Sequence, residues 1–191
     1  MGHHESTALV FGQSLHRVLK EIETALSRAD RTVAADFINE LREAKAVYTT
    51  GAGRSGLAVA SFAMRLVHLG LTAHVAGDAT TPSIGPGDLL VACSGSGEKP
   101  TVLVLAETAK QTGARVVAVT AAEHSSLAWL ADLVVTLPEG RGGYDSCDSE
   151  QFMGTLFEQA AYLFFDSVVL TMQKLADIET DEMRDRHTNL E

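Results

Sequence analysis

The 191-residue chain is short of several residue types, and each shortage excludes a class of protein. It has two cysteines, Cys93 and Cys147, in no CxxC pair, which excludes a disulfide framework and favours a reducing compartment. It has no apolar run near the ~18 residues that a membrane span requires, and no charged-then-apolar leader. We therefore expect a soluble, cytoplasmic protein without a membrane partner.

Basic residues are also scarce. Lysine and arginine total 15 against 25 aspartates and glutamates, which gives a formal net charge of −10. A nucleic-acid partner would require a basic face, so none is expected. The seven histidines show no metal-ligand spacing, and the sequence therefore predicts no metal site.

After an N-terminal helical arm, short apolar strands alternate with helical patterns. Strands are expected at residues 46–50, 72–75, 88–93, 115–120 and 133–137. Helices are expected at about 55–69, 100–112, 126–131, 150–175 and 179–185. The alternation predicts an α/β fold with a doubly wound, five-stranded parallel sheet of strand order 2-1-3-4-5. Residues 1–191 should form one domain, made of an arm at about 8–43, a core at about 45–175 and a helix and tail at 176–191.

The first expected strand runs into the glycine-rich turn Gly51–Gly56, which matches the pattern GxGxxG. In dinucleotide-binding domains this turn holds a pyrophosphate, and an acid about 20 residues further on binds the ribose. Asp78 stands at such a distance, but it is expected in a loop rather than at a strand end. A dinucleotide site is therefore a minor alternative.

The third expected strand ends in Ser94-Gly95-Ser96-Gly97, and a helix follows. Glycines let backbone N–H groups turn toward a ligand, hydroxyls add donors, and a helix N-terminus favours an anion. A tight connection that merely needs small residues is the plainer explanation. Because two hydroxyl-bearing glycine-rich loops should open at the same edge of the sheet, phosphate binding is the preferred interpretation.

Glu158 is the sole acid between Glu150 and Asp166 in a strongly apolar helical stretch. Partial desolvation would make its carboxylate a better base. The alternative is an exposed stripe shared with Gln151 and Thr155, and the sequence does not decide between the two. The apolar character of the same stretch suggests burial against another subunit.

A set of short motifs runs along the chain: Gly51–Gly56, Ala63-Met-Arg-Leu66, His68-Leu-Gly70, Thr80-Thr-Pro82, Ser94–Gly97, Gly154-Thr-Leu-Phe-Glu158 and Arg186-His-Thr-Asn-Leu-Glu191. Taken as a set, these motifs resemble the sugar isomerase (SIS) family, in particular its members that isomerise hexulose phosphates. The resemblance covers residues from about 45 to the C-terminus.

The resemblance implies an isomerase without a cofactor, active as a homotetramer built from dimers. Its reaction would interconvert D-arabino-hex-3-ulose 6-phosphate and D-fructose 6-phosphate through a cis-enediolate, in the ribulose monophosphate route of formaldehyde fixation. A SIS module that senses a sugar phosphate without catalysis is the alternative, since it would need Ser94–Gly97 but not Glu158 or His187.

The resemblance also assigns site residues. It implies Glu158 as the catalytic base and His187 as a group that reaches the active site of its own or a neighbouring subunit. Many relatives have threonine where this chain has Lys99. Either the charge of Lys99 replaces the missing hydroxyl, or Thr101 moves in to supply one. The substrate and its phosphate would be bound by Arg54, Ser55, Ser94, Gly95, Ser96, Gly97, Glu98 and Lys99.

Overall fold

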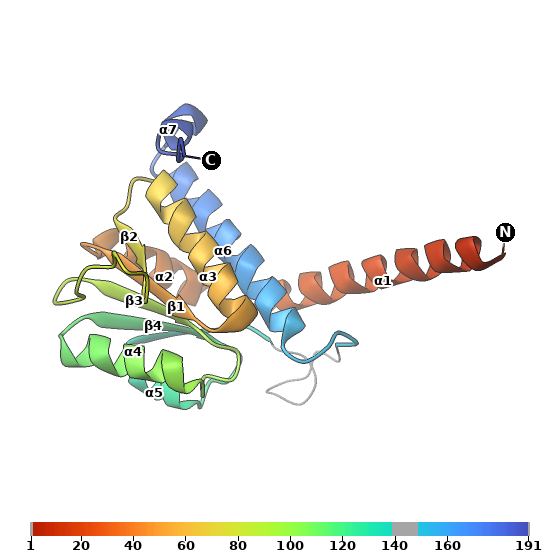
Figure 1. The fold of residues 1–191 in the computed structure, drawn as a ribbon, viewed down its shortest axis with the longest axis horizontal. Coiled ribbons are helices and arrows are strands. Elements are labelled where there is room, and N and C mark those ends of the chain that lie inside the picture. Colours follow the sequence, from red (N-terminus) through yellow and green to blue (C-terminus); the bar gives the residue numbers. More distant parts are fainter. Residues whose placement is uncertain (1, 139–148, 191) are drawn as a thin grey trace.

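The computed structural model describes residues 2–138 and 149–190 and shows a parallel sheet between two layers of helices (Figure 1). Its strands run in the order β2-β1-β3-β4-β5, and every neighbouring pair is parallel. The predicted strand order is confirmed. The strands are β1 (Val47–Gly51), β2 (Ala73–Val75), β3 (Leu89–Cys93), β4 (Arg115–Thr120) and β5 (Leu133–Thr136).

Helices cover both faces of the sheet. One face carries α2, α3 and α6, and the other carries α4 and α5 (Figure 1). The helices are α1 (Gly2–Ser27), α2 (Arg31–Glu43), α3 (Gly53–His68), α4 (Pro100–Gln111), α5 (Ser126–Leu130), α6 (Thr155–Leu175) and α7 (Thr180–Asp185). None of the described helices is long and apolar enough to cross a membrane.

The core follows from the two-residue period of the central strands. Along β3, Leu89, Val91 and Cys93 pack toward α2, α3 and α6, whereas Leu90 and Ala92 pack toward α4 and α5. A strand that is apolar on both sides has to be covered on both faces, which is why these runs predict a parallel sheet.

Local signals set several helix ends where they are expected. The carboxylate of Asp30 accepts hydrogen bonds from the N–H groups of Thr32 and Val33 and so caps α2. Gly70, with φ at +91°, follows α3, and the N–H of Leu71 donates to the carbonyl of Leu66. This left-handed turn is the usual glycine stop of a helix.

Two expected helix starts are corrected by the structure. The arm helix begins at Gly2 rather than near residue 8. The apolar helix begins at Thr155 rather than at residue 150, because Gly154 takes the N-cap position and Met153 adopts a left-handed φ of +47°. Residues 139–148, which include Cys147 and separate the expected strand at 133–137 from the expected helix at 150–175, lie outside the described residues.

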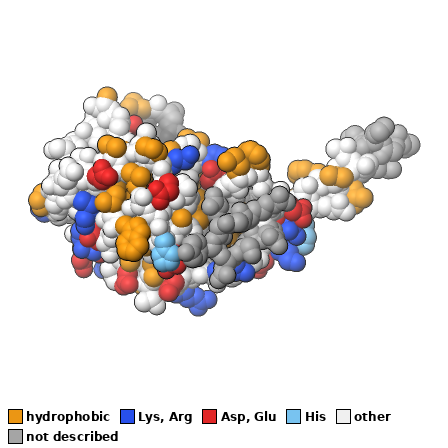
Figure 2. Space-filling view, turned by 90° about the horizontal axis from the view of Figure 1, so that it is seen from below, with side chains coloured by type: hydrophobic (Ala, Val, Ile, Leu, Met, Phe, Trp, Pro, Cys, Tyr) orange, Lys and Arg blue, Asp and Glu red, His pale blue; other side chains and the backbone are white. Residues whose placement is uncertain are grey.

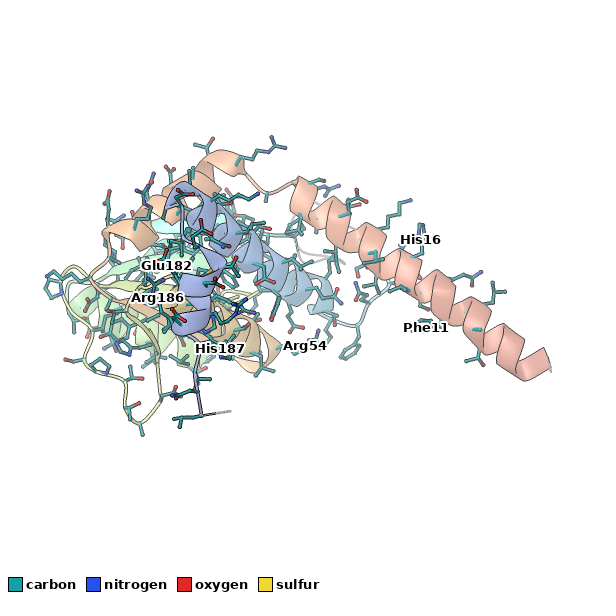
Figure 3. All side chains as sticks on the ribbon, turned by 90° about the horizontal axis from the view of Figure 1, so that it is seen from above. Phe11, His16, Arg54, Glu182, Arg186 and His187 are labelled. Carbon is teal, nitrogen blue, oxygen red and sulfur yellow. The ribbon has the colours of Figure 1, made fainter. Side chains whose placement is uncertain are left out.

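Helix α1 extends well beyond the rest of the molecule (Figures 1 and 3). Only its C-terminal part packs on the domain, where Ala25 contacts Leu156 and Ala160 of α6. Further out it carries five exposed apolar side chains: Leu9, Val10, Phe11, Leu15 and Leu19. Figure 2 shows hydrophobic side chains on the surface of this helix.

Candidate active site

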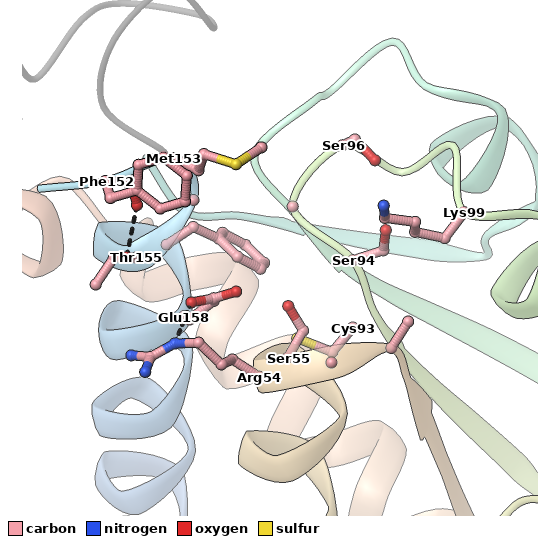
Figure 4. Close-up of a pocket in the computed structure, with 15 residues that line it drawn as sticks. Arg54, Ser55, Cys93, Ser94, Ser96, Lys99, Phe152, Met153, Thr155 and Glu158 are labelled. Atoms are coloured by element: carbon pink, nitrogen blue, oxygen red, sulfur yellow. Dashed lines mark hydrogen bonds and ion pairs between the residues drawn. The ribbon is translucent and has the colours of Figure 1, made fainter.

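A cavity of about 450 Å³ opens at the carboxyl ends of β1 and β3, beside the N-terminal turn of α6 (Figure 4). The chain leaves β1 toward β2 on one side, while β3 lies on the other, so strand order reverses here. Ligands of doubly wound sheets bind at such a switch point.

The first wall of the cavity is the turn from β1 into α3. A Cβ on Gly51 would lie 2.9 Å from the Cα of Gly56, so neither strand nor helix leaves room for a side chain there. This close approach brings Arg54 and Ser55, in the first turn of α3, to the edge of the cavity. Asp78 does not line the cavity, which removes the acid that a dinucleotide site would use.

The second wall is the loop from β3 into α4. The Ser94 hydroxyl accepts a hydrogen bond from the N–H of Gly97 at 3.2 Å, and the Ser96 hydroxyl accepts one from the N–H of Glu98 at 3.3 Å. The loop ends at Lys99, the N-cap of α4, whose side chain lines the cavity above Ser94 (Figure 4). Hydroxyls, an ammonium group and a helix N-terminus together suit a phosphate.

Gly97 fixes the shape of this loop. Its φ is +64°, and an added Cβ would lie 2.0 Å from the Ser125 hydroxyl oxygen and 2.4 Å from the Ser125 Cβ. A Gly97→Ala variant should therefore displace the loop and lose about 1–3 kcal/mol of unfolding free energy. Thermal denaturation measures the loss.

The control for Gly97→Ala is the double variant with Ser125→Gly, which removes the obstructing side chain. It should recover part of the lost stability, although the strain at φ +64° remains. A Gly97→Ala protein as stable as the wild type would show that the loop adapts freely.

The third wall comes from the start of α6. Phe152, Met153 and Thr155 line the cavity together with Glu158, one turn into the helix (Figure 4). Beneath them the ring of Phe157 lies so close to Gly95 that a Cβ there would approach it to 3.1 Å. Phe152 and Met153 were not among the predicted site residues; their signal in the sequence is an apolar pair directly before a helix-starting glycine.

Glu158 pairs with Arg54 across the cavity. The Arg54 Nε donates to the Glu158 Oε2 at 2.5 Å, joining α3 to α6 (Figure 4). The Glu158 side chain is 20% exposed, whereas that of Arg54 is 61% exposed. Burial, followed by the nearby charge of Glu158, raises the pKa of the Cys93 thiol to about 12, so that thiol is neutral beneath the cavity. Glu158 is therefore not part of an exposed stripe with Gln151 and Thr155, which was the alternative left open by the sequence.

Of the residues predicted for the site, seven line one cavity: Arg54, Ser55, Ser94, Gly95, Ser96, Lys99 and Glu158. Glu98 instead turns away, and its carboxylate accepts a hydrogen bond from the N–H of Ser126 at 2.7 Å. Hydrogen bonds from Ser126, the backbone one first, lower the pKa of Glu98. Glu98 therefore caps α5 rather than facing a phosphate, and Gly97 contributes backbone shape alone.

The structure does not bring His187 to the cavity of its own chain. The His187 ring stacks on His68 with ring centroids 5.0 Å apart, at the C-terminal end of α3. Arg54 stands at the other end of that helix, and at 1.5 Å per residue the two ends lie about 20 Å apart. No group of three potential metal ligands occurs among the residues that the structure describes.

Comparisons with known proteins agree on the family. The SIS domain family matches residues 40–163. The chain is 41% identical to the 3-hexulose-6-phosphate isomerase of Mycobacterium gastri over 93% of its own length and 90% of that protein. It is 35% identical to the enzyme of the same name from Bacillus subtilis, over 91% of this chain and 95% of the relative.

Solved structures show the same fold. A Methanococcus jannaschii protein, whose crystal structure led to an inferred function of 3-hexulose-6-phosphate isomerase, superposes with a TM-score of 0.81. The two chains are 31% identical, and the match covers 94% of this chain and 99% of the other.

Proposed function

The chain belongs to the SIS domain family, and we propose that it is a 3-hexulose-6-phosphate isomerase. Relatives that carry this name match nearly the full chain. We further propose that the whole chain is one catalytic domain, that it acts in the cytoplasm, and that it serves the ribulose monophosphate route of formaldehyde fixation.

One observation carries the proposal: a carboxylate and a loop that bears hydroxyls and a lysine face the same cavity. Glu158 lies on the α6 side, and Ser94, Ser96 and Lys99 lie on the loop side. A sugar phosphate bound through its phosphate at the loop would extend its carbon chain toward Glu158. Binding energy gained at the phosphate then holds the reacting carbons against the base.

The reaction requires one base acting on two adjacent carbons. Glu158 removes the proton from C2 of the 3-ketose, and the electrons form a cis-enediolate between C2 and C3. Return of the proton to C3, with transfer of a hydroxyl proton from O2 to O3, gives fructose 6-phosphate. The overall step is an isomerisation, so it consumes no oxidant or reductant.

Arg54 has two tasks in this scheme. Its Nε holds the Glu158 carboxylate in place, and its exposed guanidinium retains donors for an enediolate oxygen. Lys99 supplies positive charge to the phosphate where many relatives use a hydroxyl. Ser55, buried beside Arg54, completes the polar lining.

We propose a homotetramer, a dimer of dimers, and that His187 serves the active site of a neighbouring subunit, because it is remote from its own. The outer faces of α3 and α6 expose apolar side chains that would lie at subunit contacts: Leu57, Val67, Tyr162, Leu163 and Leu170. Light scattering at micromolar concentration should therefore show an oligomer. A fully active monomer would refute both the interface and a shared His187.

A coupled assay tests the function. Hexulose 6-phosphate is made from formaldehyde and ribulose 5-phosphate by a separate synthase, and fructose 6-phosphate is then followed through glucose-6-phosphate isomerase and dehydrogenase. Formation of fructose 6-phosphate that depends on this protein is expected. Binding of fructose 6-phosphate without conversion would instead identify the non-catalytic sensor module.

A further inference from the structure

Glu21 is a buried carboxylate on α1, outside the candidate active site. Glu21 as a whole is 6% exposed, whereas the part of α1 that precedes it is largely exposed. Its Oε1 accepts hydrogen bonds from the Nε of Arg17 at 2.6 Å and from the N–H of Glu150 at 3.1 Å. Its Oε2 accepts from the Oγ of Ser149 at 2.7 Å and from the Nε2 of Gln151 at 3.0 Å.

Three of these four donors belong to one short segment, residues 149–151. The Ser149 hydroxyl, itself on a buried residue, also accepts from the N–H of Gln151 at 3.0 Å. Arg17 adds an ion pair to the Glu150 carboxylate at 3.3 Å. Helix α1 therefore holds this segment through charge-assisted hydrogen bonds that the segment donates to a single carboxylate.

The held segment leads directly into the wall of the active-site cavity. Phe152 and Met153 follow it and line the cavity, Gly154 caps α6, and Glu158 lies in the first turn. Met153 has a φ of +47°, a conformation that costs a non-glycine residue energy and persists when its surroundings enforce it. Residues 149–151 precede Met153 and α6 follows it, and together they hold its backbone in this conformation.

We propose that Glu21 is a positioning residue for catalysis: through residues 149–151 it fixes the Phe152–Met153 wall and the first turn of α6, and so the place of Glu158. Burial by itself raises the pKa of Glu21, but its four hydrogen bonds outweigh burial and hold the pKa at about 2. The carboxylate is therefore charged at neutral pH and can accept all four hydrogen bonds. The proposal rests on the proposed isomerase function for its kinetic consequences.

Glu21→Gln tests the proposal because an amide has one accepting oxygen. With its NH₂ group at the Oε1 position, the amide loses the hydrogen bonds from Arg17 and from the N–H of Glu150; at the Oε2 position, the Ser149 hydroxyl and the Gln151 amide must reverse in order to accept from it. In both orientations the negative charge that strengthens all four hydrogen bonds is removed. Displacement of the reacting groups should lower kcat by about 10- to 100-fold. KM for fructose 6-phosphate should change by less than about 3-fold, since the loop Ser94–Lys99 lies on the opposite wall.

The matched control is Glu23→Gln, the same change two residues on at an exposed position of α1, which should leave both constants unchanged. Ser149→Ala removes one donor while leaving Glu21 intact, and it should lower kcat in the same direction by less. It serves as the second variant if Glu21→Gln folds poorly.

Amide hydrogen exchange gives a readout that does not depend on activity. In Glu21→Gln, exchange should accelerate in a peptide covering residues 149–157 and stay unchanged in one covering β3 and the start of α4. Normal kcat with unchanged exchange would overturn the proposal. Faster exchange throughout, with loss of fructose 6-phosphate binding by calorimetry, would also overturn it, since Glu21 would then support the fold alone. Inactive wild-type protein would refute the proposed function, and the exchange result would still decide whether Glu21 holds the wall.

Discussion

Replacing Glu158 with glutamine should lower kcat by roughly 10²–10⁴-fold, because the amide keeps the shape of the side chain but cannot accept a proton from carbon. The variant should fold, since the residue is partly exposed and the Arg54 side chain with which it pairs is open to solvent. Binding of fructose 6-phosphate, measured by calorimetry, should stay within a few-fold of the wild type.

Glu107→Gln is the matched control for Glu158→Gln. Glu107 is an exposed residue of α4, on the opposite face of the sheet from α3 and α6, so the same change of side chain removes a charge without touching the cavity. It should retain wild-type kcat. Near-normal turnover in Glu158→Gln would mean that Glu158 only anchors Arg54, and that the base lies elsewhere.

Introducing a negative charge at Ser96 should have the second-largest effect. Ser96→Asp would place a carboxylate in the loop that we propose binds the phosphate, and like charges about 4 Å apart repel by about 4 kcal/mol near a protein surface. KM for fructose 6-phosphate should therefore rise at least about 100-fold. Initial rates over a wide range of substrate concentrations measure the change.

Two variants separate charge from size at Ser96. Ser96→Asn has the size of aspartate without its charge, and it should raise KM far less than Ser96→Asp. Ser96→Ala removes one neutral hydroxyl and should cost on the order of 1 kcal/mol of binding. Equal KM values for the asparagine and aspartate variants would show that the phosphate binds elsewhere.

The sheet could be predicted from the sequence because its signals are local. Each strand is an apolar run followed by glycine or a polar turn, and Gly70 and Asp30 mark helix ends through their own backbone or side-chain geometry. The loop Ser94–Gly97 was also predictable, since its glycines and hydroxyls are adjacent in the chain. The start of α6 was placed too early because apolar character continues through Phe152 and Met153, while Gly154 interrupts the helix.

The pairings across the site could not be predicted, because they join residues far apart in the chain. Arg54 and Glu158 are 104 residues apart and meet only when α3 packs on α6. The family resemblance assigned Glu98 to the substrate and its phosphate, yet the N-terminus of α5 offers its carboxylate an N–H donor. In the sequence, Arg17 and Glu21 have the four-residue spacing of an ordinary ion pair on a helix surface. Glu21 is buried only in the tertiary structure.

The position of proton exchange tests the central claim, an isomerisation between C2 and C3, most directly. Fructose 6-phosphate is incubated with the wild-type protein in D₂O, and its protons are followed by NMR. The account predicts deuterium at C3, at least in part, no deuterium at C1, and loss of the exchange in Glu158→Gln. Deuterium at C1 would contradict it, because that pattern belongs to an isomerase acting between C1 and C2.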